Sequence, residues 1–583
     1  MDKGYVWATE DIYPSLDDWE TDFKKVKDDF SFSEFKGKLS DPKIFYACMK
    51  KEEKIFRTVD KLFLYASMNH DADTRVSKYD ALLSRVTSLA AKVGAETAFV
   101  LPELTALSEE KLLSFAENPD LKDYDYTIRL TLKEKAHVLS ESEEKLLAEG
   151  AETFSSFHDI FGKIDDADLP LGTIRIGKEK TPFSHGLYSV LLHDEDAKLR
   201  RKAFKKYYGA YVSLINVISA TYYGSVKKDC YKARVKKYSS ALDMALSGED
   251  VPEIVYKNLI SAVEKGIPSL HEYMAVKKKE LKYKRMHTYD LYVPSVKKAE
   301  LKLSYEDAYD LVIRGLSVLG EEYTELLKKA RDNRWIDVEE RKGKRSGAYS
   351  TGVYDSHPFV LLNYQKTTHD VFTIAHELGH SIHTYFSNKN QPYAKADYRI
   401  FVAEVASTVN EVLLVKYLLK EAKDGKFKKY LLSYLLEMVR TTLFRQTQFA
   451  EFEEFSHSSV ENGVPLTKDN MCEKYLELNK KYYGKAVYHD EEIKYEWARI
   501  PHFYRAFYVY KYATGITSAL AIADRILNEG EPAVKDYFKF LSSGGSDSPV
   551  ELLKIAGVDL TGEKPFIKAM GVFKDTLKEY EKL

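Results

Sequence analysis

The stretch DVFTIAHELGHSIHTYF, residues 370–386, decides the fold around it, because His376, Glu377 and His380 form the motif H-E-x-x-H. Apolar residues recur in it at helical spacing and predict one helix: Val371, Ile374, Ala375, Leu378 and Ile382. Residues four apart share a helix face, so the two histidines can present their rings to one metal ion. Glu377 points about 100° around the helix, beside the open coordination position, where it can accept a proton from water.

A third metal ligand has to come from outside this motif. A metzincin would have a histidine where this chain has Phe386, so that class is excluded. His383 is on the same helical stripe but about 10.5 Å along the axis from His376, too far to share its ion, and we interpret it as structural. The remaining candidates are the downstream carboxylates of Asp397 and Glu404.

The stretch FVAEVASTVNEVLLVKYLL, residues 401–419, predicts the helix that carries Glu404. Its apolar stripe consists of Val402, Val405, Val409, Val412 and Leu413. Glu404 faces away from that stripe, where a glutamate is usually solvated. Because it follows the H-E-x-x-H helix after a short loop, we interpret Glu404 as the third ligand, with Asp397 as the alternative. Ser407, Thr408 and Glu411 are candidates to orient the ligands.

The amino-acid composition of the chain indicates a mainly α-helical protein. Glycine (28) and proline (16) are sparse among the 583 residues, and Lys, Glu and Leu are abundant. Residues 165–193 differ, with several glycines and prolines around the short β-like TIRIG. We therefore predict an N-terminal helical domain, 1–195, and a catalytic domain, 196–583. A second break at residues 342–364 predicts one or two strands just before the H-E-x-x-H helix.

Charge and cysteine content limit the possible partners and the compartment. The net charge is −2, from 88 basic and 90 acidic residues, so we expect no nucleic acid and no membrane as a partner. The three cysteines are far apart and suit a reducing compartment. The first residues contain no basic segment followed by an apolar one, so we expect no secretory signal and a cytoplasmic location.

The motifs HELGHSIH and FVAEVASTVNE, with Glu404 placed 24 positions after His380, resemble the M3 family of zinc metallopeptidases, most closely its oligoendopeptidase F branch. Further stretches are similar to the same branch: YDLYVP (289–294), GAYSTGVYDSHPFVLLNY (347–364) and RIPHFYRAFYVYKYATG (499–515). The resemblance covers the C-terminal two-thirds of the chain and is looser before residue 195.

The resemblance implies a mainly α-helical zincin-type ellipsoid, with a small β-sheet beside the H-E-x-x-H helix and a deep substrate channel. It implies cleavage of short unstructured peptides, with one Zn²⁺ per chain. Carried over residue by residue, the zinc ligands fall on His376, His380 and Glu404, and the general base falls on Glu377.

A tyrosine-rich segment, residues 499–515, supplies candidates for transition-state stabilisation. Tyr504, Tyr508 and Tyr512 recur every four residues, which predicts that they share one helical stripe. Peptide hydrolysis at zinc builds negative charge on the former carbonyl oxygen, and a phenol or imidazole can stabilise it. The resemblance assigns this role to His502 and Tyr508, with Tyr504 and Tyr512 as weaker substrate-binding candidates.

The strand segment before the H-E-x-x-H helix offers a way to bind an extended peptide. An exposed sheet edge can pair with a substrate backbone by β-strand addition, which ignores side chains and fits broad specificity. Gly347 and Gly352 would then allow close approach or a mobile loop. The alternative is that both are ordinary turn glycines.

The sequence thus predicts a zinc endopeptidase that cleaves short oligopeptides. Two alternatives stay open: a zinc carboxypeptidase or dipeptidyl carboxypeptidase, and a helical binding protein without catalysis.

Overall fold

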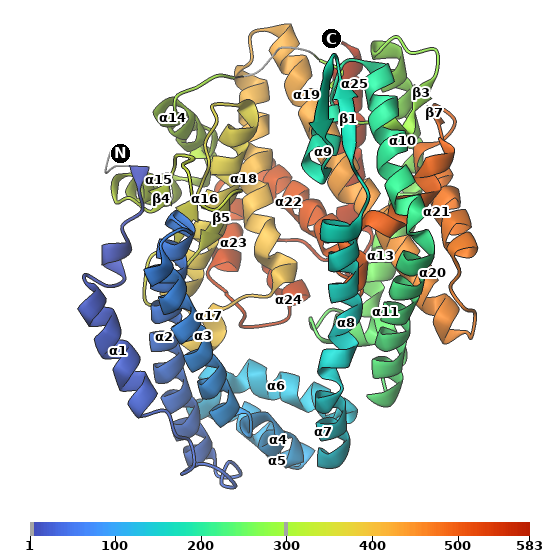
Figure 1. The fold of residues 1–583 in the computed structure, drawn as a ribbon. Coiled ribbons are helices and arrows are strands. Elements are labelled where there is room, and N and C mark those ends of the chain that lie inside the picture. Colours follow the sequence, from blue (N-terminus) through green and yellow to red (C-terminus); the bar gives the residue numbers. More distant parts are fainter. Residues whose placement is uncertain (1–4, 297–300) are drawn as a thin grey trace. The chain divides into compact units, whose positions relative to one another are not determined.

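The computed structural model describes residues 5–296 and 301–583, and its elements are mostly helices, as Figure 1 shows. The expected mainly α-helical fold is confirmed. Contacts divide the chain into two compact units. Unit 1 consists of residues 1–138, 300–420 and 518–558, and unit 2 of residues 139–299, 421–517 and 559–583.

The bounds of the elements follow, unit by unit. Unit 1 contains α1 (Leu16–Asp28), α2 (Pro42–Ala72), α3 (Ser77–Thr97), α4 (Val100–Ala106), α5 (Glu109–Ala116), α6 (Asp125–Glu134), α14 (Tyr305–Gly315), α15 (Glu321–Asp332), β4 (Ile336–Asp337), β5 (Tyr349–Thr351), β6 (Phe359–Leu361), α16 (Thr368–Asn390), α17 (Tyr393–Ala396), α18 (Ile400–Glu421), α23 (Glu531–Leu541) and α24 (Pro549–Ile555). Unit 2 contains α7 (Glu141–Glu149), α8 (Ala151–Lys163), β1 (Thr173–Ile176), β2 (Glu179–Pro182), α9 (His185–Leu192), α10 (Ala197–Ser213), α11 (Ile215–Val235), α12 (Ala241–Ser247), α13 (Glu253–Glu280), β3 (Met286–His287), α19 (Gly425–Val439), α20 (Arg445–Glu461), α21 (Lys468–Tyr483), β7 (Val487–Tyr488) and α25 (Lys564–Glu581). Helix α22 (Tyr510–Glu529) begins in unit 2 and ends in unit 1.

The long helices α1, α2 and α3 form one hydrophobic core of unit 1. The Asp41 side chain caps α2 by accepting from two backbone N–H groups, and Pro42 occupies the first turn, where its missing N–H costs nothing. Trp19 of α1 is fully buried, and its indole N–H donates to the Leu62 carbonyl of α2 at 3.0 Å. Phe359 of β6 belongs to the same core, which therefore reaches the sheet beside α16.

The three-stranded sheet of unit 1 has the order β4-β6-β5, with β4 parallel and β5 antiparallel to β6. Strands β5 and β6 both pack against α16, so the expected strands lie beside the H-E-x-x-H helix. The buried Lys344 ammonium pairs with Asp337 at 2.6 Å and donates to the Leu362 carbonyl at 2.5 Å. This lysine joins the end of β4 to the end of β6.

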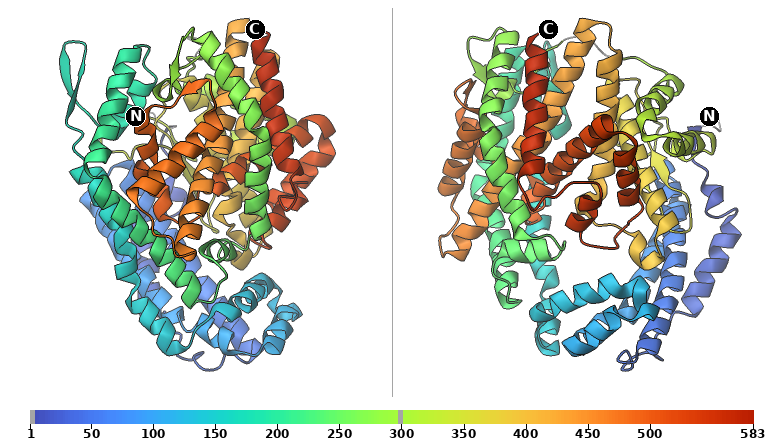
Figure 2. Two further views of the ribbon diagram at one scale, coloured as in Figure 1. Left: turned by 90° about the vertical axis from the view of Figure 1, so that its right-hand side faces the viewer. Right: turned by 180° about the vertical axis from the view of Figure 1, so that it is seen from behind.

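Unit 2 is built from long helices that are distant in sequence. Helices α13 and α25 pack together, and Figure 2 shows them side by side in green and red. Between α13 and α19 lies a buried ionic group in which Glu437 accepts from Lys277 at 2.8 Å and from Arg440 at 2.6 Å. A fully buried lysine and arginine are tolerated because they share a carboxylate.

The β-like texture near residue 174 is confirmed as the antiparallel hairpin β1-β2. Residue 195 follows it, between α9 and α10, inside unit 2. The domain boundary expected there stays a prediction, as do the ellipsoidal outline and the deep channel.

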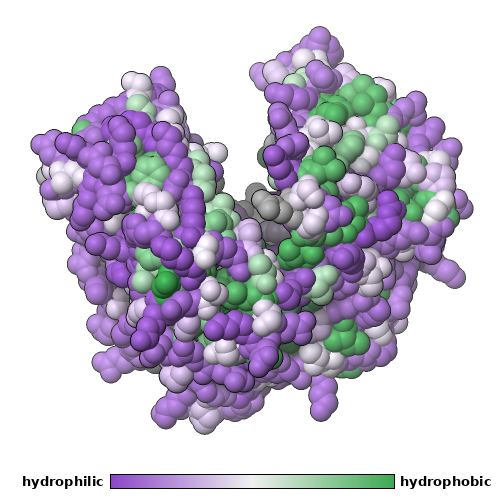
Figure 3. All heavy atoms as spheres, turned by 90° about the horizontal axis from the view of Figure 1, so that it is seen from below, coloured by the Kyte–Doolittle hydropathy of each residue, from purple (hydrophilic) through white to green (hydrophobic). Residues whose placement is uncertain are grey.

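Hydrophilic side chains, purple in Figure 3, cover much of the face shown there, and hydrophobic ones form scattered green patches. Within residues 5–296 and 301–583, no helix is both long and apolar enough to cross a membrane.

Candidate metal centre

Helix α16 carries the H-E-x-x-H motif and begins with a capping box. The Thr367 hydroxyl accepts from the Asp370 N–H at 3.2 Å, and the Asp370 carboxylate accepts from the Thr367 N–H at 2.8 Å. The apolar stripes predicted for α16 and α18 are all buried, so both helices form as expected. Their common packing brings residues far apart in sequence to one place.

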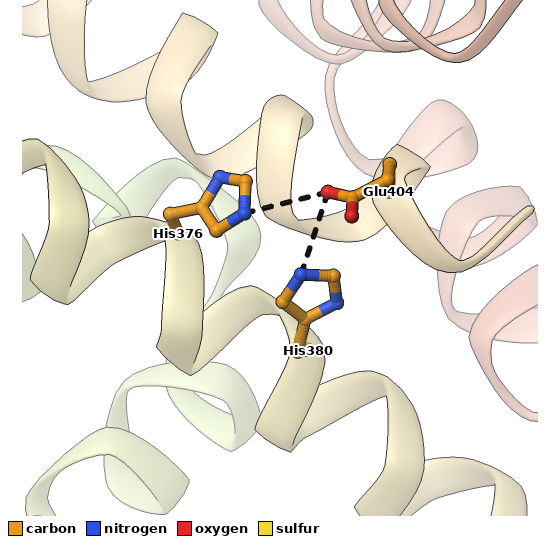
Figure 4. A group of neighbouring side chains, drawn as sticks. All are labelled: His376, His380 and Glu404. Atoms are coloured by element: carbon orange, nitrogen blue, oxygen red, sulfur yellow. Dashed lines mark ion pairs between the residues drawn. The ribbon is translucent and has the colours of Figure 1, made fainter. Parts of the chain in front are cut away.

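His376, His380 and Glu404 form one group of potential ligands, drawn in Figure 4. Glu404 Oε2 lies 3.4 Å from His376 Nε2 and 3.5 Å from His380 Nε2. A direct charge-assisted hydrogen bond would be shorter, about 2.7–2.9 Å. Two ligands of a tetrahedral ion held at about 2.0–2.2 Å lie about 3.4 Å apart. These spacings therefore fit three side chains that share one small cation.

The electrostatics of the group favour a positive charge. Burial alone would lower the pKa of His376, but the nearby carboxylates of Glu404 and Glu411 outweigh it and raise this pKa to about 10. Burial would raise the pKa of Glu404, but His376 and His380 outweigh it and hold this pKa well below its ordinary value. The Glu404 side chain is 38% exposed, so water can reach the site.

Two further side chains of α18 orient these ligands. The His376 Nδ1 and Glu411 Oε1 atoms lie 2.6 Å apart, which fixes the ring with Nε2 toward Glu404. The Ser407 hydroxyl lies 3.2 Å from Glu404 Oε2 and donates to the Glu404 carbonyl at 3.0 Å. Of the three expected orienting groups, the structure places Ser407 and Glu411 in contact with a ligand residue. The orienting role of Thr408 stays a prediction.

Glu377 lies one position after His376 and is only 7% exposed. Burial raises the pKa of its carboxyl group, and the two histidines lower it by less. A carboxyl group with a raised pKa takes up a proton more readily than an ordinary glutamate. The role of Glu377 as general base stays a prediction.

Gly379 is a residue of this centre that the sequence analysis missed. A Cβ atom at this position would lie 2.6 Å from the Ser407 Cα atom and 2.7 Å from the Ala406 carbonyl oxygen. Only glycine allows α16 to approach the α18 backbone this closely. The Asn410 amide, which donates to the Ala375 carbonyl at 2.9 Å, ties the same two helices together. The signal available in the sequence was a glycine in the middle of a strong helix.

The other candidates near the motif lie apart from the group. Asp397 is exposed and does not belong to the ligand group. His383 is buried and stacks on Tyr398 at 3.8 Å between ring centroids. Burial lowers the pKa of His383 to about 3, so this ring is neutral, as a structural histidine would be.

Comparisons with known proteins agree with this geometry. The model of Peptidase family M3 matches residues 190–572, more than half of the chain. The chain belongs to peptidase family M3. The Oligopeptidase F model matches residues 103–170, and the resemblance seen in the sequence is confirmed.

Individual relatives are similar over almost the whole of this chain. Oligopeptidase PepF of Bacillus subtilis is 44% identical over 99% of this chain and 87% of its own. Group B oligopeptidase PepB of Streptococcus agalactiae is 39% identical, over 100% of this chain and 98% of its own. A crystal structure of a putative peptidase from Chlamydophila abortus has 36% identity and a TM-score of 0.94, over 100% of this chain and 98% of its own. Oligoendopeptidase-F from Enterococcus faecium has 35% identity and a TM-score of 0.74, over 97% of each chain.

The two glycines of the strand segment differ. Gly347 is exposed and has a φ of +87°, which favours glycine, and nothing lies near its Cβ position. At Gly352 a Cβ atom would lie 3.2 Å from Pro358 Cα, a tight contact that supports close packing of the turn. No strand among the described residues pairs with the outer edge of β5. Peptide binding at this edge stays a prediction.

The prediction that Tyr504, Tyr508 and Tyr512 share one helical stripe is wrong. Tyr504 ends a short 3₁₀ turn, Pro501–Tyr504, and α22 begins only at Tyr510. Phe507 between them has a φ of +53°, which no helix can accommodate.

Three of the four side chains nevertheless gather within unit 2. His502 Nε2 lies 3.3 Å from the Tyr512 hydroxyl oxygen, and the Tyr508 ring lies 6.0 Å from His502 and 5.6 Å from Tyr512. Tyr504 is buried, stacked on Phe161 at 4.5 Å. The roles of all four residues stay predictions.

Proposed function

We propose that this M3 peptidase is a zinc-dependent endopeptidase that hydrolyses internal bonds of short oligopeptides. The observation that carries the proposal is the meeting of His376, His380 and Glu404 at metal-ligand spacing, with Glu377 next in the motif. The relatives' names, oligopeptidase and oligoendopeptidase, support the substrate class.

Zinc is the cation that suits these donors best. Two imidazole nitrogens and one carboxylate oxygen form the three-ligand set of catalytic zinc sites, which keep one position open. A bound Zn²⁺ supplies Lewis-acid chemistry, because it acidifies water and polarises the scissile carbonyl group. One ion per chain is expected. Glu411 holds His376 in the ring orientation that points Nε2 at the ion.

Glu377 is the proposed general base. Its carboxylate accepts the proton of the attacking water and then delivers it to the leaving amine nitrogen. The raised pKa of this buried carboxyl group favours the first transfer, because the conjugate base of a weaker acid takes up a proton more readily.

His502 and Tyr508 are the proposed donors to the oxyanion. Burial and the nearby Arg505 lower the pKa of His502, so its ring is neutral at pH 7 and can donate one N–H. The phenol of Tyr508 offers a second donor. Tyr512, in contact with His502, and Tyr504 are proposed as substrate-binding residues with smaller effects.

Substrate backbone is proposed to pair with the free edge of β5, with Gly347 and Gly352 framing that strand. β-Strand addition forms hydrogen bonds to the substrate main chain, so it is compatible with many substrate sequences. A cytoplasmic location is part of the proposal, supported by three buried free thiols: Cys48, Cys230 and Cys472.

The test is digestion of a fluorescence-quenched ten-residue peptide with and without a chelator, followed by mass spectrometry. Internal fragments that disappear with chelator and return with added zinc are expected. Trimming from the C-terminus alone would favour a carboxypeptidase. Absence of hydrolysis by zinc-loaded protein would favour a binding protein.

A further inference from the structure

The turn before α22 contains a strained residue. Phe507 has a φ of +53° although it carries a large side chain, which is only 2% exposed. Such a backbone persists only where the surrounding contacts enforce it, and strained residues gather at functional sites. The next residue is Tyr508, one of the proposed oxyanion donors.

Glu453 of α20 contacts the backbone of this turn. Its Oε1 atom accepts a hydrogen bond from the Phe507 N–H at 2.9 Å, and the glutamate is fully buried. The Phe507 ring packs against His457 of α20, at 4.5 Å between centroids, and against Tyr256 of α13, at 5.7 Å. Both the backbone and the ring of Phe507 are therefore fixed by long helices of unit 2.

Burying a carboxyl group costs desolvation free energy, and the hydrogen bond to one backbone N–H offsets only part of that cost. Within the described residues, Glu453 Oε2 has no hydrogen-bond partner in the protein, and Asp229 Oδ2 and His457 Nε2 face each other at 3.6 Å without a hydrogen bond. Burial, helped by the charge of Asp229, raises the pKa of Glu453 well above its ordinary value. Apolar side chains would suit such a core better, so stability alone does not explain this glutamate.

A second metal site does not explain the cluster either. Among the described histidine, cysteine and acidic side chains, only His376, His380 and Glu404 have the spacing of metal ligands. Glu453 therefore has one visible task, which is the Phe507 N–H.

We propose that Glu453 is a positioning residue that holds the Phe507 turn and thereby places the phenol of Tyr508 for the reaction. The inference rests on the proposed function and deepens it, because it explains how a residue outside any helix keeps a fixed position. Glu453 touches neither substrate nor metal and acts only through the turn.

Glu453→Leu is the first variant of the test, measured in zinc-loaded full-length protein. It removes the acceptor and leaves the Phe507 N–H unpaired. If the loss equals that of one oxyanion donor, kcat/KM falls about 10²-fold with zinc content unchanged. Glu453→Gln keeps an acceptor and should rescue most of the loss. Glu454→Leu, on the neighbouring residue of the same helix, is the matched control.

A double-mutant cycle with Tyr508→Phe separates positioning from general damage. If Glu453 acts through the Tyr508 phenol, Glu453→Leu should cost less than about 3-fold once that phenol is gone. A merely structural glutamate would cost the same factor in both backgrounds. That multiplicative result would overturn the inference.

A spectroscopic measurement that does not depend on catalysis tests the positioning role of Glu453 separately from the proposed peptidase function. Fluorotyrosine at position 508 should change its ¹⁹F resonance in Glu453→Leu and keep it in Glu454→Leu. An unchanged resonance overturns the inference even if the protein proves to have no peptidase activity. If Glu453→Leu does not fold, Glu453→Asp withdraws the acceptor by one methylene and is judged by the same shift.

Discussion

The α16–α18 pair and the tyrosine segment differ in what holds their functional side chains. The first is two regular helices with buried apolar stripes, and His376, His380 and Glu404 all lie on these helices. The second is an irregular segment before α22, whose Phe507 N–H donates to Glu453, 54 positions away. In the regular helices, the helical repeat itself sets the spacing of the functional side chains. In the tyrosine segment, the geometry involves a long-range contact that cannot be recognised from the local sequence.

The largest effect on activity should come from removing the proposed general base of the α16–α18 pair without changing the geometry of the site. Glu377→Gln keeps the shape of α16 but cannot accept a proton. We expect kcat to fall by about 10³–10⁴-fold, at the upper end of general base catalysis, with full zinc occupancy by elemental analysis. Turnover close to that of the unaltered protein would remove Glu377 from the mechanism.

Gly379→Ala tests whether the close approach of α16 and α18 is essential. The added methyl group meets backbone atoms of Ser407 that cannot move alone, so we expect about 1–3 kcal/mol of destabilisation and weaker zinc binding. Gly94→Ala is the control, since this helical glycine of α3 has open space. It should be neutral or stabilise by up to about 1 kcal/mol. Equal melting temperatures for the two variants would contradict this account.

Glu411→Gln tests the support behind His376. The amide still fits, but it loses the charge that holds Nδ1, so we expect zinc affinity to fall about 10-fold in competition with a chromophoric chelator. Glu421→Gln, at the exposed end of the same helix, should leave affinity unchanged. The assignment fails if both variants bind zinc equally well.

The last effect lies outside both compared regions, in the core of unit 2, which contains buried ionic groups. Burial alone would raise the pKa of Glu437, but Arg440 and Lys277 outweigh it and lower this pKa to about 2. Its stabilisation is therefore complete above the ordinary value of 4.5 and is lost as pH falls toward 2. We expect about 2 kcal/mol of acid-dependent stability that Glu437→Gln lacks, measured by urea unfolding at pH 7 and pH 3. Parallel pH curves for the two proteins would rule this out.

Helical periodicity and the spacing of the H-E-x-x-H motif were sufficient to predict α16, α18 and the pairing of His376 with His380. The choice of Glu404 over Asp397 as their partner depended on its place after the motif helix and on the resemblance to family M3. The sequence could not reveal the role of Gly379, since the cost of a Cβ depends on a backbone that arrives from another helix. It also gave the wrong geometry for Tyr504, Tyr508 and Tyr512. Their four-residue spacing fits a helix, but the Phe507 turn breaks it.

The length of β5 has a consequence for solubility. A long exposed sheet edge has unpaired backbone N–H and C=O groups, with which other copies of the same chain can pair and form aggregates. β5 spans only Tyr349–Thr351, between the positive-φ Gly347 and the tightly packed Gly352. Such a short edge offers a guest peptide a few backbone groups, but too few for a second copy of the sheet to dock and propagate.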